Sequence, residues 1–395
     1  MENFIFGFTG AFGSGCSFII KEFFQNRRNA KVFSLSSELK IMFANDNPGA
    51  VPSRNVLQEY GNHVRSRDGA NVLANKVLGK IGDEVAGGSI TKDTLICIDS
   101  IRNPEEIKKL REAFPRFILV AVFAGHEKRW ERVKTAYESK HDAFQDDEYK
   151  DQGSDEPAYG QRIADCFFEA DVIISNDDEI SIDGENDAYH KMSRKLDQYV
   201  RSFMDPTQGH PLIVESLMAS AYASGRRSRC LKRKVGAIIV DENGSIISSG
   251  YNDVPFTLKT CQQKHGNCYR SVKKAQMEAL IAGIINEDHD KSTKIISKFK
   301  ILDFCRAVHA EENAILNLVR NSSRTDYSKC TLYTTTYPCN LCANKIAQIG
   351  IKNIVYFEPY PIVEAYDILA ESSVTQVSFE GVTFRAFFRA YNFLP

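Results

Sequence analysis

His309-Ala310-Glu311 and, further along the chain, Pro338-Cys339-Asn340-Leu341-Cys342 are the stretches that decide the fold of the second half of this sequence. One imidazole and two thiolates are typical zinc ligands, and three protein ligands leave the fourth tetrahedral position open for water. Zinc lowers the pKa of that water toward neutrality. Glu311 falls in the first turn of an expected helix, where its carboxylate can move protons. We therefore predict a catalytic zinc site with His309, Cys339 and Cys342 as ligands and Glu311 as the proton shuttle.

The second ligand pair is expected at the start of a helix that begins at Pro338, because proline is tolerated where the first turn needs no amide donor. The dipole of that helix would favour negatively charged sulfur. A structural zinc site, or buried reduced cysteines, is the alternative interpretation, but neither has a use for Glu311. The pattern H-x-E followed by P-C-x-x-C is the signature of zinc deaminases. The chain resembles that class of enzyme at these residues.

The resemblance is to the deoxycytidylate deaminase branch of the cytidine deaminase superfamily, and it extends from about Ser216 to Phe357. It implies a three-layer α/β/α deaminase fold around a mixed sheet, and conversion of a deoxycytidine nucleotide (dCMP, dCTP or both) into the deoxyuridine nucleotide. It also implies that Asn252 hydrogen-bonds the sugar or base of the substrate. The remaining landmarks are Ser228-Arg229-Cys230, Lys234 to Val240, Gly250-Tyr251-Asn252, Cys305 to Ile315 and Thr336 to Ala343.

A second group of cysteine and histidine residues lies between these landmarks. Relatives in the family often carry a second, structural zinc in this region, and four ligands without an open position would fit that role. The alternative is that some of these cysteines are small core residues. The first choice of ligands is Cys230, Cys261, Cys268 and Cys305, with His265 as a substitute.

The first half of the chain alternates apolar strand-like runs with helical segments. Strands separated by helices predict a parallel sheet that is covered on both faces. The strand candidates are 4–9, 32–35, 94–99, 117–123 and 170–175, and helices are expected at 17–26, 104–113 and 127–139.

A glycine-rich stretch, 10–17, follows the first strand and opens a helix, which is the context of a phosphate-binding P-loop. Backbone amides would cradle phosphates there, and Ser17 stands where a magnesium-binding hydroxyl belongs. The lysine that should follow Gly15 and stabilise charge during phosphoryl transfer is Cys16. We therefore predict that this domain binds a nucleoside triphosphate and Mg²⁺ but is not an efficient kinase. The alternative is a domain that keeps the fold and binds nothing. The predicted loop residues are Gly10, Gly13, Ser14, Gly15, Cys16 and Ser17.

Other features of this half resemble small nucleotide kinases. Asp99 ends an apolar strand and is a candidate magnesium or phosphate residue, and Arg102 is a candidate for the missing positive charge. A charged stretch with Arg129 and Arg132 follows. Cys16, at a helix N-terminus, is also hypothesised to be a low-pKa, oxidation-sensitive thiol.

Two domains are expected: a P-loop kinase-like domain over 1–205 and a zinc deaminase domain over 206–395. The boundary is drawn at the helix-breaking run Asp205-Pro206-Thr207-Gln208-Gly209. The polar segment 139–160 is interpreted as a mobile loop or lid.

The chain has 395 residues, and its 50 basic and 51 acidic side chains leave a net charge of −1, which gives no indication of a nucleic-acid or membrane protein. No apolar run is long enough to span a bilayer, and the start of the chain does not resemble a signal peptide. We expect a cytoplasmic protein, because clustered cysteines in a reducing compartment more often hold metal than form disulfides.

A kinase-like domain ahead of a deoxycytidylate deaminase resembles bacterial anti-phage deaminases, which deplete dCTP and dCMP during infection. That resemblance implies a homo-oligomer, often a hexamer, and for some members an inhibitory small RNA. A housekeeping dCMP deaminase that supplies dUMP is one alternative. A polynucleotide deaminase is another, and its basic channel would use the cluster Arg226–Lys234. A binding module with an inactive site is disfavoured, because all the predicted catalytic residues are present.

Overall fold

The computed structural model describes residues 3–25, 29–152, 158–177, 187–205, 207, 209–284, 304–321, 326–358 and 363–391. The chain divides into two compact units, of which the first combines Met1–Glu215 with Glu380–Pro395 and the second is Ser216–Phe379. The predicted division at 205/206 therefore precedes the observed one, and it misses the return of the C-terminal segment to the first unit. The reason is structural: the segment after Phe379 adds a strand to the first sheet.

The first unit is built on a six-stranded sheet with the strand order β11-β5-β4-β1-β3-β2. Its strands β1 to β5 run parallel, and only the edge strand β11 is antiparallel. All seven residues of β4 are buried, as expected for a central strand covered on both faces. The predicted parallel sheet is confirmed. The strands are β1 (Ile5–Thr9), β2 (Ala30–Ser34), β3 (Leu95–Asp99), β4 (Phe117–Phe123), β5 (Val172–Ser175) and β11 (Gly381–Val382).

Helices connect these strands. Helix α5 starts at Pro104 as predicted, because Asn103 and Glu106 form a reciprocal capping box at its N-terminus. Among the described residues, no helix combines the length and the apolar character needed to cross a membrane. The α-helices of the first unit are α1 (Cys16–Ile20), α2 (Leu35–Asp46), α3 (Arg54–Asp68), α4 (Val72–Ala86), α5 (Pro104–Ala113), α6 (His126–Val133), α7 (His141–Gln152), α8 (Ile163–Phe168), α9 (Asp187–Met204) and α17 (Phe387–Ala390).

Helix α7 occupies the polar segment that was interpreted as a loop or lid. Phe144 is its apolar anchor: it is 1% exposed and packs against the rings of Trp130 and Tyr137. A single buried aromatic residue in a polar sequence was too weak a pattern to predict this helix. The interpretation of 141–152 as irregular is therefore wrong, while residues 153–157 lie outside the described part of the chain.

The second unit has a mixed five-stranded sheet with the order β10-β9-β8-β6-β7. Strand β6 pairs antiparallel with β7 and β8, and β8, β9 and β10 run parallel. The strands are β6 (Gly236–Val240), β7 (Ile246–Tyr251), β8 (Thr331–Thr334), β9 (Asn353–Tyr356) and β10 (Thr375–Ser378).

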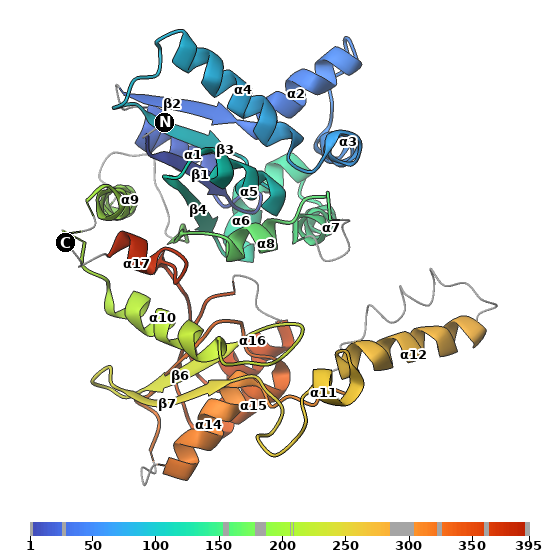
Figure 1. The fold of residues 1–395 in the computed structure, drawn as a ribbon, viewed down its shortest axis with the longest axis vertical. Helices are drawn as coiled ribbons and strands as arrows, with labels where there is room; N and C mark the ends of the chain where they lie inside the picture. Colours follow the sequence, from blue (N-terminus) through green and yellow to red (C-terminus); the bar gives the residue numbers. More distant parts are fainter. Residues whose placement is uncertain are drawn as a thin grey trace. The chain divides into compact units, whose positions relative to one another are not determined.

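Helices cover both faces of this sheet. Apolar residues of α14 (Ala310–Asn321), α15 (Asn340–Ile349) and α16 (Val363–Glu371) share one core with β6, β8 and β9. On the other face, the backbone of α10 (Ile213–Gly225) lies against Gly236 of β6. The predicted three-layer deaminase fold is confirmed. Helices α11 (Cys261–His265) and α12 (Tyr269–Ile284) follow β7, and α12 extends away from the sheet (Figure 1).

Candidate metal centre

His309, Cys339 and Cys342 come together in the second unit. The Nδ1 atom of His309 lies 3.3 Å from the sulfur of Cys339 and 3.5 Å from the sulfur of Cys342. Tetrahedral zinc with ordinary bond lengths would separate a nitrogen and a sulfur ligand by about 3.6 Å. In the described part of the chain, this is the group of three ligand atoms that lie within 4.8 Å of one another. The three residues therefore fit a zinc ion.

The ligands stand at the N-termini of two helices. The carbonyl of His309 accepts the first hydrogen bond of α14, and Cys339 is the N-cap of α15. Pro338 was expected inside the first turn, but the helix begins at Asn340, because Cys339 keeps an extended backbone with ψ 169°. Cys342 then falls in the first turn of α15, and both thiols face the positive end of the helix dipole.

Close packing fixes the position of His309. A Cβ on Gly250 of β7 would lie 2.3 Å from the carbonyl oxygen of Ala310, so only glycine lets α14 approach this strand. Just before the helix, Val308 and Asp253 exchange two backbone hydrogen bonds of 2.9 and 3.2 Å. These contacts anchor the residue next to the ligand from a neighbouring loop.

Glu311 is 3% exposed and lies beside the ligand group. Its Oε2 atom is 3.7 Å from the Cys342 sulfur, and its Oε1 atom accepts a hydrogen bond of 3.2 Å from the Thr334 hydroxyl. Burial raises the pKa of this carboxyl above its ordinary value. A raised pKa favours the protonated form of the carboxyl, and a proton shuttle has to take up and release a proton.

The two ligand thiols have pKa values that are shifted in opposite directions. The neighbouring Cys342 thiol lowers the pKa of Cys339, and His309 lowers it further, although partial burial opposes the change. The pKa of Cys342 is raised by Cys339 and by burial. A metal that binds both sulfurs would bind them as thiolates and release their protons.

Asn252, the predicted substrate residue, is 8% exposed and bonds to the backbone. Its side-chain oxygen accepts a hydrogen bond of 2.8 Å from Val235 N–H, and its amide nitrogen donates one of 2.9 Å to the carbonyl of Arg233. Asn252 therefore holds the loop before β6. Its second amide hydrogen is the group left for a substrate.

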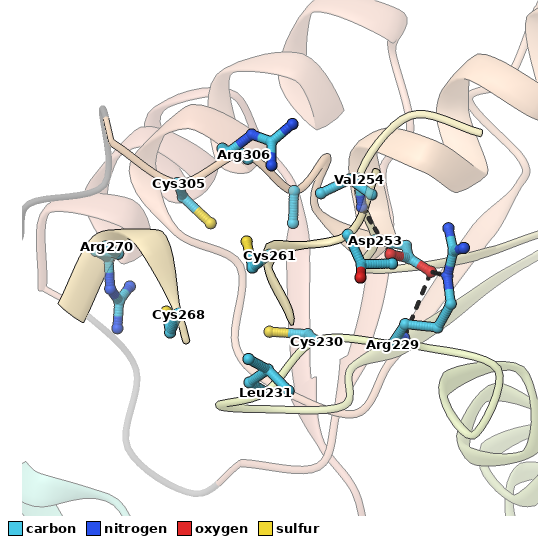
Figure 2. A pocket seen from close by; sticks show the side chains of 12 residues that line it. Arg229, Cys230, Leu231, Asp253, Val254, Cys261, Cys268, Arg270, Cys305 and Arg306 are labelled. Carbon is cyan, nitrogen blue, oxygen red and sulfur yellow. Dashed lines mark hydrogen bonds and ion pairs between the residues drawn. The ribbon is translucent and has the colours of Figure 1, made fainter. Parts of the chain in front are cut away.

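The four cysteines chosen for a second metal line one pocket of the second unit (Figure 2). The sulfurs of Cys230, Cys261 and Cys305 point toward the middle of the group, with Cys268 beside them. Their ligand atoms are less tightly gathered than those of the catalytic group. His265 is not among the lining residues, because its ring stacks on Tyr269 at 4.5 Å.

The predicted phosphate loop connects β1 to α1 in the first unit. Gly13 and Gly15 have φ angles of 82° and 93°, in the left-handed region that favours glycine. A Cβ on Gly15 would also lie 2.3 Å from the amide nitrogen of Asn176. That nitrogen donates a hydrogen bond of 2.8 Å to the carbonyl of Ser14, while Arg132 donates one of 3.3 Å to the carbonyl of Gly13. The carbonyls of the loop are thus tied back to the domain.

Ser17 and Asp99 meet at the end of the loop. The Ser17 hydroxyl donates a hydrogen bond of 3.3 Å to the Asp99 carboxylate, and burial raises the pKa of that carboxyl. Burial raises the pKa of both Asp99 and Cys16, and the positive charge of Arg102 partly offsets that rise. Arg102 also donates a hydrogen bond of 3.0 Å to Gln161.

The hypothesis that Cys16 is a low-pKa thiol is wrong for this structure. Its sulfur turns inward, 3.5 Å from the Ser14 hydroxyl and close to Gly10. Burial raises the pKa of this thiol to about 12. The short helix dipole does not offset the loss of water around the sulfur.

Sequence reasoning missed Thr334, the residue that orients the Glu311 carboxylate. It is fully buried at the end of β8. The sequence around Thr334 is that of an ordinary apolar strand that ends in threonines. Only the folded sheet shows which of these threonines faces Glu311.

Together, the fold and the His309, Cys339 and Cys342 geometry define a zinc deaminase. Residues 213–358 match the family model of the cytidine and deoxycytidylate deaminase zinc-binding region. The deoxycytidylate deaminase of Enterobacteria phage T4 is 34% identical over 161 residues, which are 37% of this chain and 77% of the phage protein. The chain belongs to the cytidine and deoxycytidylate deaminase family, and it is a hydrolytic deaminase.

Two further relatives match different lengths of this chain. The deoxycytidylate deaminase of Schizosaccharomyces pombe is 28% identical over 286 residues, which are 72% of this chain and 76% of the yeast protein. That alignment is longer than the second unit, so it extends into the first. The crystal structure of the dCMP deaminase from the cyanophage S-TIM5, in complex with dCMP and dUMP, is 28% identical, covers 43% of this chain and 98% of that chain, and has a TM-score of 0.30.

Proposed function

We propose that the chain deaminates free deoxycytidine nucleotides, dCMP and dCTP, to the deoxyuridine nucleotides. The observation that carries this proposal is the approach of His309 Nδ1 to two cysteine sulfurs beside a buried glutamate. Membership of the deoxycytidylate deaminase family supports the choice of base and sugar. Zinc held by His309, Cys339 and Cys342 would activate the attacking water as a Lewis acid.

Glu311 carries out the proton transfers in this proposal. It takes a proton from the attacking water and delivers protons to N3 of the cytosine ring and to the departing ammonia. Its raised pKa favours the protonated form between these steps. The hydrogen bond from Thr334 keeps one carboxylate oxygen fixed, and the other oxygen, 3.7 Å from the Cys342 sulfur, is left for the proton transfers.

The basic loop between α10 and β6 is proposed to hold the substrate phosphates. Asn252, which directly follows β7, hydrogen-bonds the backbone of this loop at Arg233 and Val235, and the next residue, Asp253, pairs with Val308 beside the zinc ligand. Arg229 and Arg233 bind Asp253 and Glu358, whereas the side chains of Lys232 and Lys234 are exposed. A short cationic loop next to the metal ligand suits a nucleotide better than a long polynucleotide channel.

A second, structural zinc is proposed at Cys230, Cys261, Cys268 and Cys305. The four side chains line one pocket and come from separate segments of the chain. Four thiolates closing around one ion would tie these segments together. His265 stays the substitute ligand: its ring stacks on Tyr269 outside the pocket lining, but its buried Nε2 atom has no hydrogen-bond partner among the described residues.

The first unit is proposed to bind a nucleoside triphosphate with Mg²⁺ and to regulate the deaminase. Support comes from the two left-handed glycines, from the Ser17–Asp99 pair and from the positive charge of Arg102, which acts on both Asp99 and Cys16. Arg102 would supply part of the charge that the P-loop lysine normally provides. Its guanidinium is also bonded to Gln161, so binding without efficient phosphoryl transfer is expected.

The biological role that we propose is depletion of deoxycytidine nucleotides in anti-phage defence. A housekeeping supply of dUMP is the second candidate, and the alignment with the fission yeast deaminase favours it, because that alignment extends into the first unit. Comparing dCTP and dCMP pools after phage infection of cells with wild-type or Glu311→Gln protein separates the two. A fall that needs both infection and Glu311 supports defence, whereas a Glu311-dependent fall that is the same with and without infection supports housekeeping. The homo-oligomer and the inhibitory small RNA stay predictions.

The activity is tested with purified protein and dCMP, dCTP, CTP or single-stranded DNA, with and without ATP or GTP. We expect uracil products from dCMP and dCTP, none from DNA, and a rate that changes with ATP or GTP. The variant Glu311→Gln should be inactive under all conditions. Turnover of DNA alone would reject the free-nucleotide proposal. A deamination rate that is the same with and without ATP or GTP would reject regulation by the first unit.

A further inference from the structure

Arg54, at the start of α3, lies against the phosphate loop of the first unit. Its guanidinium stacks on the ring of Phe12, a loop residue, with 3.8 Å between the guanidinium carbon and the ring centroid. Phe12 also packs edge-on against Tyr137. The positive charge of Arg54 is therefore fixed next to the loop that is proposed to bind phosphates.

An acidic residue of α7 holds this arginine. Arg54 Nε donates a hydrogen bond of 3.0 Å to the Asp147 carboxylate, and the Tyr137 hydroxyl donates one of 2.7 Å to the same oxygen. The Asp147 side chain is only 7% exposed. A carboxylate at this depth is stabilised by the cation that it faces.

The next residue of α7 repeats the arrangement. Glu148 binds the guanidinium of Arg129 through one oxygen and lies 2.6 Å from His126 Nδ1 through the other. The backbone of Arg129 is in contact with the loop, because a Cβ on Gly13 would lie 3.0 Å from its carbonyl oxygen. Two consecutive carboxylates of one helix thus pair with two arginines that flank the phosphate loop (Figure 1 shows α3, α6 and α7 in the first unit).

A second arginine of α3, Arg65, lies about three helical turns after Arg54 and projects from the same side of the helix. It is 2% exposed and donates two hydrogen bonds to Glu106, while its Nη1 atom has no partner within the described residues. Glu106 therefore holds this guanidinium within the first unit.

We propose that Arg54 is a phosphate-binding residue of the nucleotide site, and that Asp147 occupies it in the ligand-free protein. Phosphate and carboxylate bind the planar guanidinium in the same way, so each can replace the other on Arg54. A nucleoside triphosphate then binds the loop by displacing the carboxylates of α7, and α7 senses whether the site is filled. This inference rests on the proposed nucleotide binding of the first unit.

The test measures binding of ATP with Mg²⁺, and of inorganic tripolyphosphate, to the full chain by calorimetry. Asp147→Asn should raise the affinity about fivefold or more, because a neutral amide competes less strongly than a carboxylate for the Arg54 guanidinium. Arg54→Gln should lower it. In the double variant the gain from Asp147→Asn should disappear, since both changes act on one contact. The matched control is Asp142→Asn on the same helix, where the side chain is exposed and the affinity should not change.

Three outcomes would overturn the inference. Unchanged or weaker binding in Asp147→Asn, together with a lower melting temperature, would make Asp147 a structural residue only. A gain that survives in the Arg54→Gln background would assign the effect to another cation. If wild type and all variants bind neither probe, the proposed nucleotide site is rejected together with this inference. If Ser17→Ala weakens binding but Asp147→Asn leaves it unchanged, the nucleotide site stands and only this inference is rejected.

Discussion

The buried carboxylate of Glu215 accepts a hydrogen bond of 2.7 Å from the backbone N–H of Val382, which lies 167 residues further along the chain. Its second oxygen accepts bonds of 2.7 Å from the Tyr391 hydroxyl and from Leu212 N–H. Glu215 is the last residue before the chain enters the second unit, and the segment with Val382 is the one that returns from it. Within the first unit, one side chain therefore joins the segment that precedes the second unit to the segment that follows it.

Glu215→Gln should destabilise the first unit by about 1–3 kcal/mol, because an amide cannot accept from all three donors and leaves buried polar groups unsatisfied. Trp130, the single tryptophan of the chain, reports on this unit, so urea unfolding can be followed by its fluorescence. The control is Glu380→Gln, whose partly exposed pair with Lys195 should contribute less than about 1 kcal/mol. Equal effects of the two changes would remove the special role of Glu215.

The return of the C-terminal segment to the first unit could not be predicted from the sequence, because the strand that it forms there is very short. Strand β11 has only two residues, and its pairing with β5 joins positions about half the chain apart. Strand β4 and helix α5, in contrast, were predicted with their exact bounds, because seven buried apolar residues and a capping box are local patterns. Helices and strands that form a local sequence pattern could be predicted, whereas a two-residue strand is too short to form such a pattern.

The candidate metal centre follows the same rule. His309 with Glu311, and Cys339 with Cys342, are pairs within one helical turn, so their spacing alone indicated the site. The hydrogen bond from Thr334 to Glu311 spans 23 residues and depends on the packing of α14 against the sheet. That contact, like the Asp147 bond to Arg54, exists only in the folded chain and leaves no pattern in the sequence.

Thr334→Val should lower kcat about tenfold and leave KM nearly unchanged, because it removes one hydrogen bond that orients Glu311 and no contact to substrate. Glu311→Gln should lower kcat by at least about 100-fold while zinc content stays at the wild-type level. Steady-state deamination of dCMP measures both. Thr331→Val, the same change at the start of β8, is the control and should keep full activity. A Thr334 variant with wild-type kcat would show that Glu311 needs no orienting bond.

Zinc content distinguishes the two cysteine groups. Wild type should carry two zinc ions per chain, and Cys261→Ser should lose one of them with a fall in melting temperature of more than about 5 °C. Cys339→Ser should lose the other ion and all activity, since it removes a predicted catalytic ligand. Cys330→Ser, fully buried and outside both groups, should keep two ions. A single ion in wild type that survives in Cys261→Ser would reject the structural site, and elemental analysis after dialysis gives the count.

Alkylation of Cys16 should be slow and should accelerate only at high pH. Only the thiolate reacts, and burial raises the pKa of this thiol to about 12 from an ordinary value of 9.0. At pH 8 the thiolate fraction is then on the order of 1,000-fold lower than that of an ordinary cysteine. Iodoacetamide labelling between pH 7 and 10, read on the Cys16 peptide by mass spectrometry, measures the profile, and Cys230, a partly exposed cysteine, serves as the internal reference after removal of zinc. A Cys16 rate that already levels off near pH 8 would contradict the inward position of its sulfur and restore the reactive-thiol hypothesis.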